Sequence, residues 1–190
     1  MKYLLVGLGN VGEEYLNTRH NIGFDIVDEF LKKHSPAKED ASFVLSRHAF
    51  KAETKWKGKT IHVIKPTTFM NLSGKAVNYW INELKVPLTN VLVVIDDLAF
   101  PFGKIKLKAA GSDAGHNGIR HINDTLGTSE YARLRFGIHA PFPRGQQIDF
   151  VLGHFDKEEA KQLPELVSNS VTIIQNFIAL GIEKAMSQKS

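Results

Sequence analysis

The feature that most constrains the fold is an unbroken apolar run at residues 91–95, Val-Leu-Val-Val-Ile. A continuous run rich in β-branched residues is typical of a strand that is buried on both faces, as in a parallel sheet covered by helices. The run is also far too short to span a membrane, which takes about 20 apolar residues. The sequence therefore predicts a central strand with helices on both sides of it.

Strand patterns alternate with helical patterns along the rest of the chain. Further strands are predicted at residues 2–8, 43–50, 60–64, 105–107 and 134–138. Helices are predicted at 22–33, at 73–84 with Ser73 as N-cap and Pro87 beyond its end, at 115–126, and twice between 156 and 186 with a break near Pro164. This alternation predicts an α/β fold, a single-domain sandwich over residues 1–190 with a central mixed, mostly parallel sheet flanked by helices.

The composition excludes several classes of protein. The chain has no cysteine, so disulfides, thiol nucleophiles and cysteine-bound metal sites are excluded, and a reducing compartment suits it. The apolar stretch at the N-terminus is too short for a secretion signal, and Glu13 and Glu14 follow it closely. We expect a cytoplasmic protein without a membrane segment.

The positive charge is concentrated in one part of the chain. Residues 100–145 carry seven Lys/Arg against three Asp/Glu, while the whole chain has a net charge of +4. Lys104, Lys106 and Lys108 alternate, so they would share one face of a strand. Two explanations remain open. The lysines could protect a solvated edge strand from aggregation, or they could bind an anionic partner such as a nucleic acid.

A glycine pattern near the N-terminus resembles a dinucleotide-binding loop. Gly7-x-Gly9-x-x-Gly12 follows a predicted strand, as in nicotinamide and flavin enzymes. In those enzymes a helix begins on the glycine loop, whereas here the next helical pattern begins only near Ile22. The second strand also lacks a well-placed acid for the ribose, since Glu53 is the only nearby candidate. Both points argue against a dinucleotide cofactor.

Two polar residues follow buried strands and should meet in one cleft. Asn10 comes after the first strand and Asp96 directly after the run at 91–95, and ligands of open α/β sheets bind beyond the carboxyl ends of strands. His20 precedes the helix at 22–33, whose positive end favours a neutral imidazole. A carboxylate such as Asp96 would raise the pKa of His20 and hold the ring in one tautomer. This pair would form a general base with an orienting partner, and water would be the nucleophile, since neither a cysteine nor a serine elbow motif is present.

Each of these residues also has a purely structural explanation. Asn10 and Asn117 lie beside glycines and could be turn residues. His20 could cap a helix, and Asp96 could cap a turn. The amides of Asn10, Asn71 and Asn117 would otherwise supply neutral donors for a developing oxyanion. A metal site is not expected, because there is no H-E-x-x-H pair and His116 and His121 are five residues apart, which does not place them on one helical face.

Taken together, these segments resemble the bacterial peptidyl-tRNA hydrolase family over nearly the whole chain. The similar segments are Val6-Gly7-Leu8-Gly9-Asn10, Thr18-Arg19-His20-Asn21-x-Gly23, the block at 65–74, Asp96-Asp97-Leu98, Gly115-His116-Asn117-Gly118, the stretch at 133–138 and Phe150-Val151-Leu152. They occur in the same order as in the family. The family hydrolyses the ester that joins a peptide to the 3′ end of tRNA, and so recycles tRNA from aborted translation.

The resemblance implies a role for each matching residue. His20 would be the general base, Asp96 its orienting carboxylate and His116 a supporting residue. Asn10 would help to distinguish a blocked from a free α-amino group, and Asn71 and Asn117 would bind the peptide end and position water. Tyr15 and Phe69 would line the groove for the 3′ terminal region, while Lys108 and Arg135 would lie near tRNA phosphates. The expected protein is a monomer that acts on peptidyl-tRNA without a metal or cofactor.

Three positions depart from the family pattern. Val11 stands where proline is common, Ala99 replaces the second acid of Asp-x-Leu-Asp, and Asp113-Ala114 replaces a more glycine-rich stretch. These changes concern the mouth of the cleft and leave the proposed chemical groups in place. A non-enzymatic RNA-binding module is the alternative hypothesis. It needs only the basic segment, and its salt-sensitive binding of RNA would not depend on His20 or Asn10.

Overall fold

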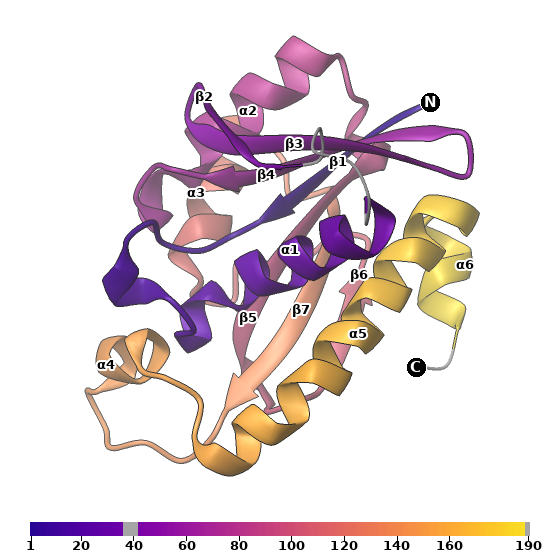
Figure 1. The fold of residues 1–190 in the computed structure, drawn as a ribbon. Helices are drawn as coiled ribbons and strands as arrows, with labels where there is room; N and C mark the ends of the chain where they lie inside the picture. Colours follow the sequence, from indigo (N-terminus) through magenta and orange to yellow (C-terminus); the bar gives the residue numbers. More distant parts are fainter. Residues whose placement is uncertain (36–41, 189–190) are drawn as a thin grey trace.

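The computed structural model describes residues 1–35 and 42–188. One seven-stranded sheet in the order β2-β3-β4-β1-β5-β7-β6 runs through them (Figure 1). The strands are β1 (Lys2–Gly7), β2 (Val44–Ser46), β3 (Ala49–Trp56), β4 (Lys59–Pro66), β5 (Val91–Pro101), β6 (Ile105–Lys108) and β7 (Ala132–His139). Strands β4, β1, β5 and β7 are parallel, β2 runs in the same direction, and β3 and β6 oppose them. The mixed, mostly parallel sheet is therefore confirmed.

Helices cover both faces of the sheet. They are α1 (Ile22–His34), α2 (Ser73–Leu84), α3 (Asn117–Leu126), α4 (Gln147–Leu152), α5 (Lys157–Leu180) and α6 (Ile182–Ser187). Short 3-10 turns lie at Glu13–Tyr15, Arg19–Asn21, Met70–Leu72 and Leu88–Asn90. Figure 1 shows α1 and α5 on one side of the sheet and α2 and α3 on the other. No described helix is both long and apolar enough to cross a membrane.

Alternating side chains of β1 divide the apolar core into two layers. Tyr3 and Leu5 pack with residues of α1 and α5, while Leu4 and Val6 pack with residues of α2 and α3. Such alternation follows from the two-residue period of a strand. The buried run at the start of β5 divides in the same way, which explains why it is apolar on both faces.

The predicted strand at 43–50 is wrong, because the chain turns within it. Strands β2 and β3 form an antiparallel hairpin in which Ser46 pairs with Ala49. The turn between them contains His48, whose φ of 62° lies in the left-handed region. Glycine or asparagine would ordinarily signal such a turn, and neither is present here.

The predicted break near Pro164 is also wrong. Helix α5 runs through Pro164 and ends at Leu180, and its C-cap Gly181 has a φ of 82°. Proline removes one backbone N–H from the helix, but the later turns bury Val171, Ile174 and Phe177 against the sheet. Burial of this apolar face outweighs one missing hydrogen bond.

Ser73 is not the N-cap of its helix. The cap position belongs to Leu72, and the hydroxyl of Ser73 donates a hydrogen bond to the carbonyl of Met70 at 2.8 Å. The helix itself has the predicted bounds, and its last turn ends at Lys85 in a left-handed conformation.

The glycines of the N-terminal pattern serve close packing in this fold. A Cβ atom on Gly7 would lie 2.4 Å from the carbonyl oxygen of Gly23, and one on Gly23 would lie 2.4 Å from that of Leu8. The end of β1 therefore approaches the first turn of α1 at backbone distance. As expected, α1 begins at Ile22 and not on the glycine loop.

Candidate active site

The candidate site lies where β5 extends beyond the end of β1. The last pair between these strands joins Gly7 to Val94, so Asp96 projects past β1. Asp96 was expected to follow its strand, but it lies within β5 and pairs with Phe136 of β7. Its carboxylate is buried, with 3% of the side chain exposed. The buried carboxylate thus requires polar partners.

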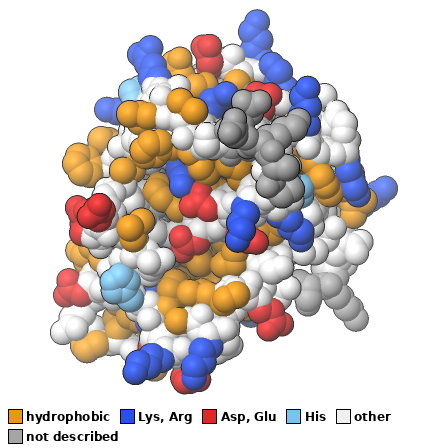
Figure 2. Space-filling view, in the orientation of Figure 1, with side chains coloured by type: hydrophobic (Ala, Val, Ile, Leu, Met, Phe, Trp, Pro, Cys, Tyr) orange, Lys and Arg blue, Asp and Glu red, His pale blue; other side chains and the backbone are white. Residues whose placement is uncertain are grey.

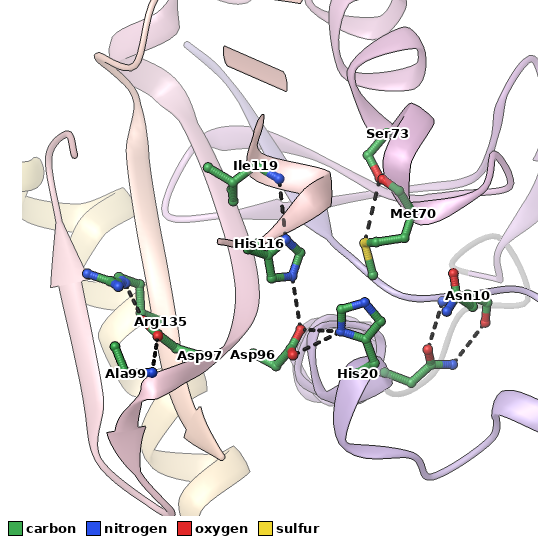
Figure 3. A network of polar contacts seen from close by, with 11 residues as sticks. Asn10, His20, Met70, Ser73, Asp96, Asp97, Ala99, His116, Ile119 and Arg135 are labelled. Atoms are coloured by element: carbon green, nitrogen blue, oxygen red, sulfur yellow. Dashed lines mark hydrogen bonds and ion pairs between the residues drawn. The ribbon is translucent and has the colours of Figure 1, made fainter. Parts of the chain in front are cut away.

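Two imidazoles supply those partners (Figure 3). His20 Nδ1 lies 2.9 Å from both carboxylate oxygens of Asp96, and His116 Nε2 lies 3.0 Å from one of them. His20 comes from the 3-10 turn at Arg19–Asn21, and His116 is the N-cap of α3. The predicted pairing of His20 with Asp96 is present in the structure, and His116 joins it as a second donor.

Hydrogen bonds define the tautomer of each ring. His116 Nδ1 accepts from the backbone N–H of Ile119 at 3.3 Å, so its Nε2 carries the hydrogen that faces Asp96. His20 donates from Nδ1 to the same carboxylate. The lone pair of a neutral His20 therefore resides on Nε2, the nitrogen that points away from Asp96.

The protonation of this group is set by opposing effects. Burial raises the pKa of Asp96, but the two imidazoles lower it further, so the net pKa lies well below its usual range. Burial lowers the pKa of His20, but the charge of Asp96 and the hydrogen bond to it raise the net pKa above 6.5. Asp96 stays ionised and favours a proton on His20, as a partner of a general base should.

The side chains of His20, Asp96 and His116 also lie close enough together to be considered as metal ligands. Their potential ligand atoms lie within 4.8 Å of one another. Each nitrogen that faces the carboxylate is a hydrogen-bond donor, however, and the N–H of Ile119 fixes this role for His116. A metal ion would have to displace both hydrogens. Direct hydrogen bonding therefore accounts for the cluster without a metal.

Asn10 is held by the residue that follows His20. The side chain of Asn21 accepts from the backbone N–H of Asn10 at 2.7 Å and donates to its carbonyl at 2.9 Å. Both backbone groups of Asn10 are thus occupied, and its own amide side chain remains half-buried at the loop surface. Asn21 belongs to a sequence segment that resembles the family, but nothing in its pattern indicated this role.

Asn71 and Asn117 lie on segments that touch each other. Asn71 belongs to the turn at Met70–Leu72, and Asn117 is the first residue of α3. Their chain neighbours meet so closely that a Cβ on Gly118 would lie 2.8 Å from the sulfur of Met70. Both asparagines are exposed. Asn117 borders the same cavity as His20 and Asp96, whereas Asn71 does not line it.

A small cavity of about 90 Å³ adjoins the His–Asp group. It is bounded by β5, by the loop that leads into α3, by β7 and by α4. The lining includes His20, Asp96, His116, Asn117, Arg135 and, from α4, Gln147, Ile148 and Val151. Five of the predicted site residues thus border one hollow. Helix α4 was not anticipated, because its short, exposed sequence has no periodic apolar pattern.

The two expected aromatic residues emerge from neighbouring strands. Tyr15 lies in the turn after β1 and is half-buried, while Phe69 lies after β4 with 78% of its surface exposed. Since β1 and β4 are adjacent, their following loops leave the sheet at the same edge. An aromatic ring as exposed as Phe69 is available for stacking.

The two expected basic residues differ in their surroundings. Arg135 forms an ion pair with the buried Asp97, and its guanidinium lies 4.8 Å from the ring centre of Phe100. Lys108 ends β6, is exposed and does not line the cavity. Asp97 was not assigned a role from the sequence, although it adjoins Asp96 in a quoted segment.

Two of the three alternating lysines, Lys106 and Lys108, share one face of β6, and Lys104 precedes the strand. Lys104 and Lys106 lie 5.4 and 5.1 Å from the ring centre of Phe100, while the intervening Ile105 packs toward the α1 and α5 layer. Figure 2 shows that layer's side of the molecule, where basic and acidic side chains are interspersed. Lys106 pairs with Arg135 of β7, so both side chains lie on the face of the sheet opposite to the one on which Ile105 packs.

Two of the three departures from the family pattern have local hydrogen-bond partners. The backbone N–H of Ala99 donates to Asp97 at 2.8 Å, and the carboxylate of Asp113 accepts from Gly115 at 2.8 Å. Val11 is 43% exposed at the loop surface. Beneath the Asp113 loop, the buried Arg133 donates to the carbonyls of Gly111 and Ser112 at 2.7 and 2.8 Å. These contacts give the loop before His116 a defined conformation.

Comparison with known proteins identifies the family of this chain. The family model described as peptidyl-tRNA hydrolase matches residues 4–190. A peptidyl-tRNA hydrolase of Phocaeicola vulgatus is 53% identical over 188 residues, which cover 99% of this chain and 98% of the relative. One of Cytophaga hutchinsonii is 48% identical over 187 residues, covering 98% and 97%.

A solved structure of the same family is similar to this chain. The crystal structure of peptidyl-tRNA hydrolase from Acinetobacter baumannii superposes with a TM-score of 0.86 at 27% identity and covers 98% of this chain and 95% of that one. The structural likeness extends over the whole sheet and both helical layers. On the strength of the matched residues and these relatives, the chain belongs to the peptidyl-tRNA hydrolase family.

Proposed function

We propose that this chain hydrolyses the ester bond between a peptide, or an N-blocked aminoacyl group, and the 3′ end of tRNA. Such a reaction recycles tRNA from aborted translation. The observation that carries the mechanism is the fixed tautomer of His20, whose Nδ1–H faces Asp96 and whose Nε2 is left as a base. The family match over residues 4–190 supports the identity of the substrate.

The reaction proceeds by activation of water. Nε2 of His20 takes a proton from a water molecule as the water oxygen attacks the ester carbonyl carbon. Asp96 stabilises the imidazolium that forms, since its carboxylate lies 2.9 Å from Nδ1. The tetrahedral intermediate then collapses, the bond between the acyl carbon and the tRNA oxygen breaks, and His20 returns the proton to the leaving tRNA hydroxyl. No covalent acyl-enzyme forms.

Neutral amides bind the acyl part of the substrate. Asn71 and Asn117 hold the peptide end and position the water, and an amide N–H can stabilise the negative charge on the carbonyl oxygen without changing its protonation with pH. Asn10 contacts the blocked α-amino group. The backbone clamp by Asn21 holds Asn10 in place for this contact.

The tRNA is bound on the outer part of the cleft. Tyr15 and Phe69 provide aromatic faces for the unpaired 3′ terminal bases, and Lys108 and Arg135 lie near the phosphates. Because Asp97 neutralises part of the charge of Arg135, Lys108 contributes the less compensated charge of the two. Metals and cofactors take no part in this scheme. We further propose that residues 1–190 act as one domain, as a monomer and in the cytoplasm.

The test is release of deacylated tRNA from N-acetyl-aminoacyl-tRNA in EDTA, with unblocked aminoacyl-tRNA in parallel. We expect cleavage of the blocked substrate and little of the free one, and Asn10→Ala should reduce this preference. Failure of the folded wild-type protein to cleave the blocked substrate would overturn the proposal. RNA binding that persists without cleavage would then favour the non-enzymatic module.

A further inference from the structure

A buried ion pair lies directly beside the catalytic turn. Arg19 precedes His20, and its Nη2 lies 2.7 Å from a carboxylate oxygen of Glu159 at the start of α5. Only 10% of the Arg19 side chain and 8% of the Glu159 side chain are exposed. A buried charge pair is costly to desolvate, so its presence calls for a specific reason.

Arg19 makes several further contacts with the same region. Its Nη1 donates to the carbonyl of His154, and its backbone N–H donates to the carbonyl of Gly153 at 2.9 Å. The guanidinium lies 4.4 Å from the ring centre of Phe150 and 5.4 Å from that of Phe155. The turn that carries His20 is thus fixed to the segment between α4 and α5 through both backbone and side chain.

Glu159 has a second function that makes it rigid. The same oxygen accepts from the backbone N–H of Asp156 at 2.9 Å, and the carboxylate of Asp156 accepts from the N–H of Glu159 at 2.8 Å. This reciprocal capping box fixes the side chain of Glu159 at the first turn of a 24-residue helix. Arg19 is therefore anchored to the capped first turn of α5.

The position of His20 depends on this anchor. The 3-10 turn at Arg19–Asn21 has no side-chain N-cap, and His20 must remain 2.9 Å from Asp96 for its base to be oriented. We propose that the Arg19–Glu159 ion pair is a positioning clamp that holds His20 against Asp96. This inference rests on the proposed hydrolysis, since it assigns the clamp a role in that reaction.

A change in the clamp should appear in the pH profile as well as in the rate. The charged or titratable groups nearest His20 are Asp96 from β5 and His116 from the start of α3. The same cavity is also lined by the charged residues Asp97, Asp113, Arg133 and Arg135. The side chains that α4 contributes to the cavity are uncharged. If His20 moves from Asp96, the carboxylate raises its pKa less, and the acid limb of kcat/KM moves to lower pH.

The experiment uses a double variant, Arg19→Gln with Glu159→Gln, which removes both charges and keeps the net charge unchanged. Any shift of the acid limb then reports geometry and not a change in field. The matched control is Lys161→Gln with Glu158→Gln, which removes an ion pair of the same 2.7 Å length from the exposed side of the same helix. A milder second variant, Arg19→Lys, keeps the charge and part of the anchoring.

We expect the double variant to lose about 10²-fold in kcat, with a smaller change in KM and an acid limb at lower pH. Arg19→Lys should be intermediate and the control should match wild type. The inference would be overturned if the double variant or Arg19→Lys had a lower melting temperature but an unchanged acid limb. The ion pair would then contribute to stability alone. Wild-type protein that does not cleave would instead overturn the proposed function.

Discussion

Replacing Asp96 with asparagine should reverse the tautomer of His20. The carboxylate now accepts two N–H groups, one from His20 at 2.9 Å and one from His116 at 3.0 Å. An amide has only one oxygen. Because the N–H of Ile119 fixes His116 as a donor, the amide oxygen remains with His116 and the amide NH₂ faces His20. His20 then avoids two opposed donors by carrying its hydrogen on Nε2, which removes the base.

The size of the effect follows from these two losses together. The variant lacks the base in its active tautomer and lacks the charge that stabilises the imidazolium. The corresponding change in a serine-protease triad, which also produces the wrong tautomer, lowers kcat by about 10⁴-fold. We expect a loss of about 10³- to 10⁴-fold here, or about 4–5.5 kcal/mol in the barrier.

The assay is single-turnover cleavage of N-acetyl-aminoacyl-tRNA by Asp96→Asn, wild type and the control Asp124→Asn, whose side chain is exposed on α3. Equal binding of the substrate and an unchanged circular dichroism spectrum would show that the fold is intact. The reasoning is refuted if folded Asp96→Asn stays within tenfold of wild type.

Three other substitutions test separate parts of the account. Lys108→Ala should weaken the binding of all tRNA sequences alike and reduce the slope of log Kd against log salt concentration by about 1. An unchanged slope would show that Lys108 does not contact a phosphate. Gly23→Ala places a Cβ 2.4 Å from the carbonyl oxygen of Leu8 and should cost about 1–3 kcal/mol, seen as a Tm lower by about 2–12 °C. Burial and the neighbouring Asp28 raise the pKa of Asp25 to about 6, so its contribution to stability is present below pH 3.8 and is lost as pH rises through about 6. Asp25→Asn should therefore raise Tm above pH 6 and leave it nearly unchanged below pH 3.8, and an equal gain at both pH values would exclude this cause.

Local patterns were sufficient for most of the fold. The apolar run at 91–95 and the spacing of Ile22, Ile26 and Phe30 predicted β5 and α1, because each element buries a face that its own sequence marks. The hairpin was missed because His48 adopts a left-handed conformation without the usual residues. The break at Pro164 was wrongly expected because apolar burial later in α5 is not a local property of the proline.

Site residues could be predicted from the sequence where their position relative to a predicted strand or helix was enough to place them. His20 and Asn117 lie at or just before the start of a helix, Asp96 lies in β5 beyond the end of β1, and the structure brings all three to one cavity. The Arg19–Glu159 ion pair joins positions 140 residues apart. The side chain of Asn21 binds the backbone N–H and carbonyl of Asn10. Neither kind of contact leaves a periodic pattern in the sequence.

The most direct measurement is hydrolysis of N-acetyl-aminoacyl-tRNA in H₂¹⁸O by wild type and His20→Ala, with mass spectrometry of both products. Attack by His20-activated water should place one ¹⁸O in the carboxylate of the released amino acid and none in the tRNA. His20→Ala should lower the rate by at least about 10²-fold, the range of general-base catalysis. Label in the tRNA hydroxyl, or a rate for folded His20→Ala within tenfold of wild type, would contradict the account.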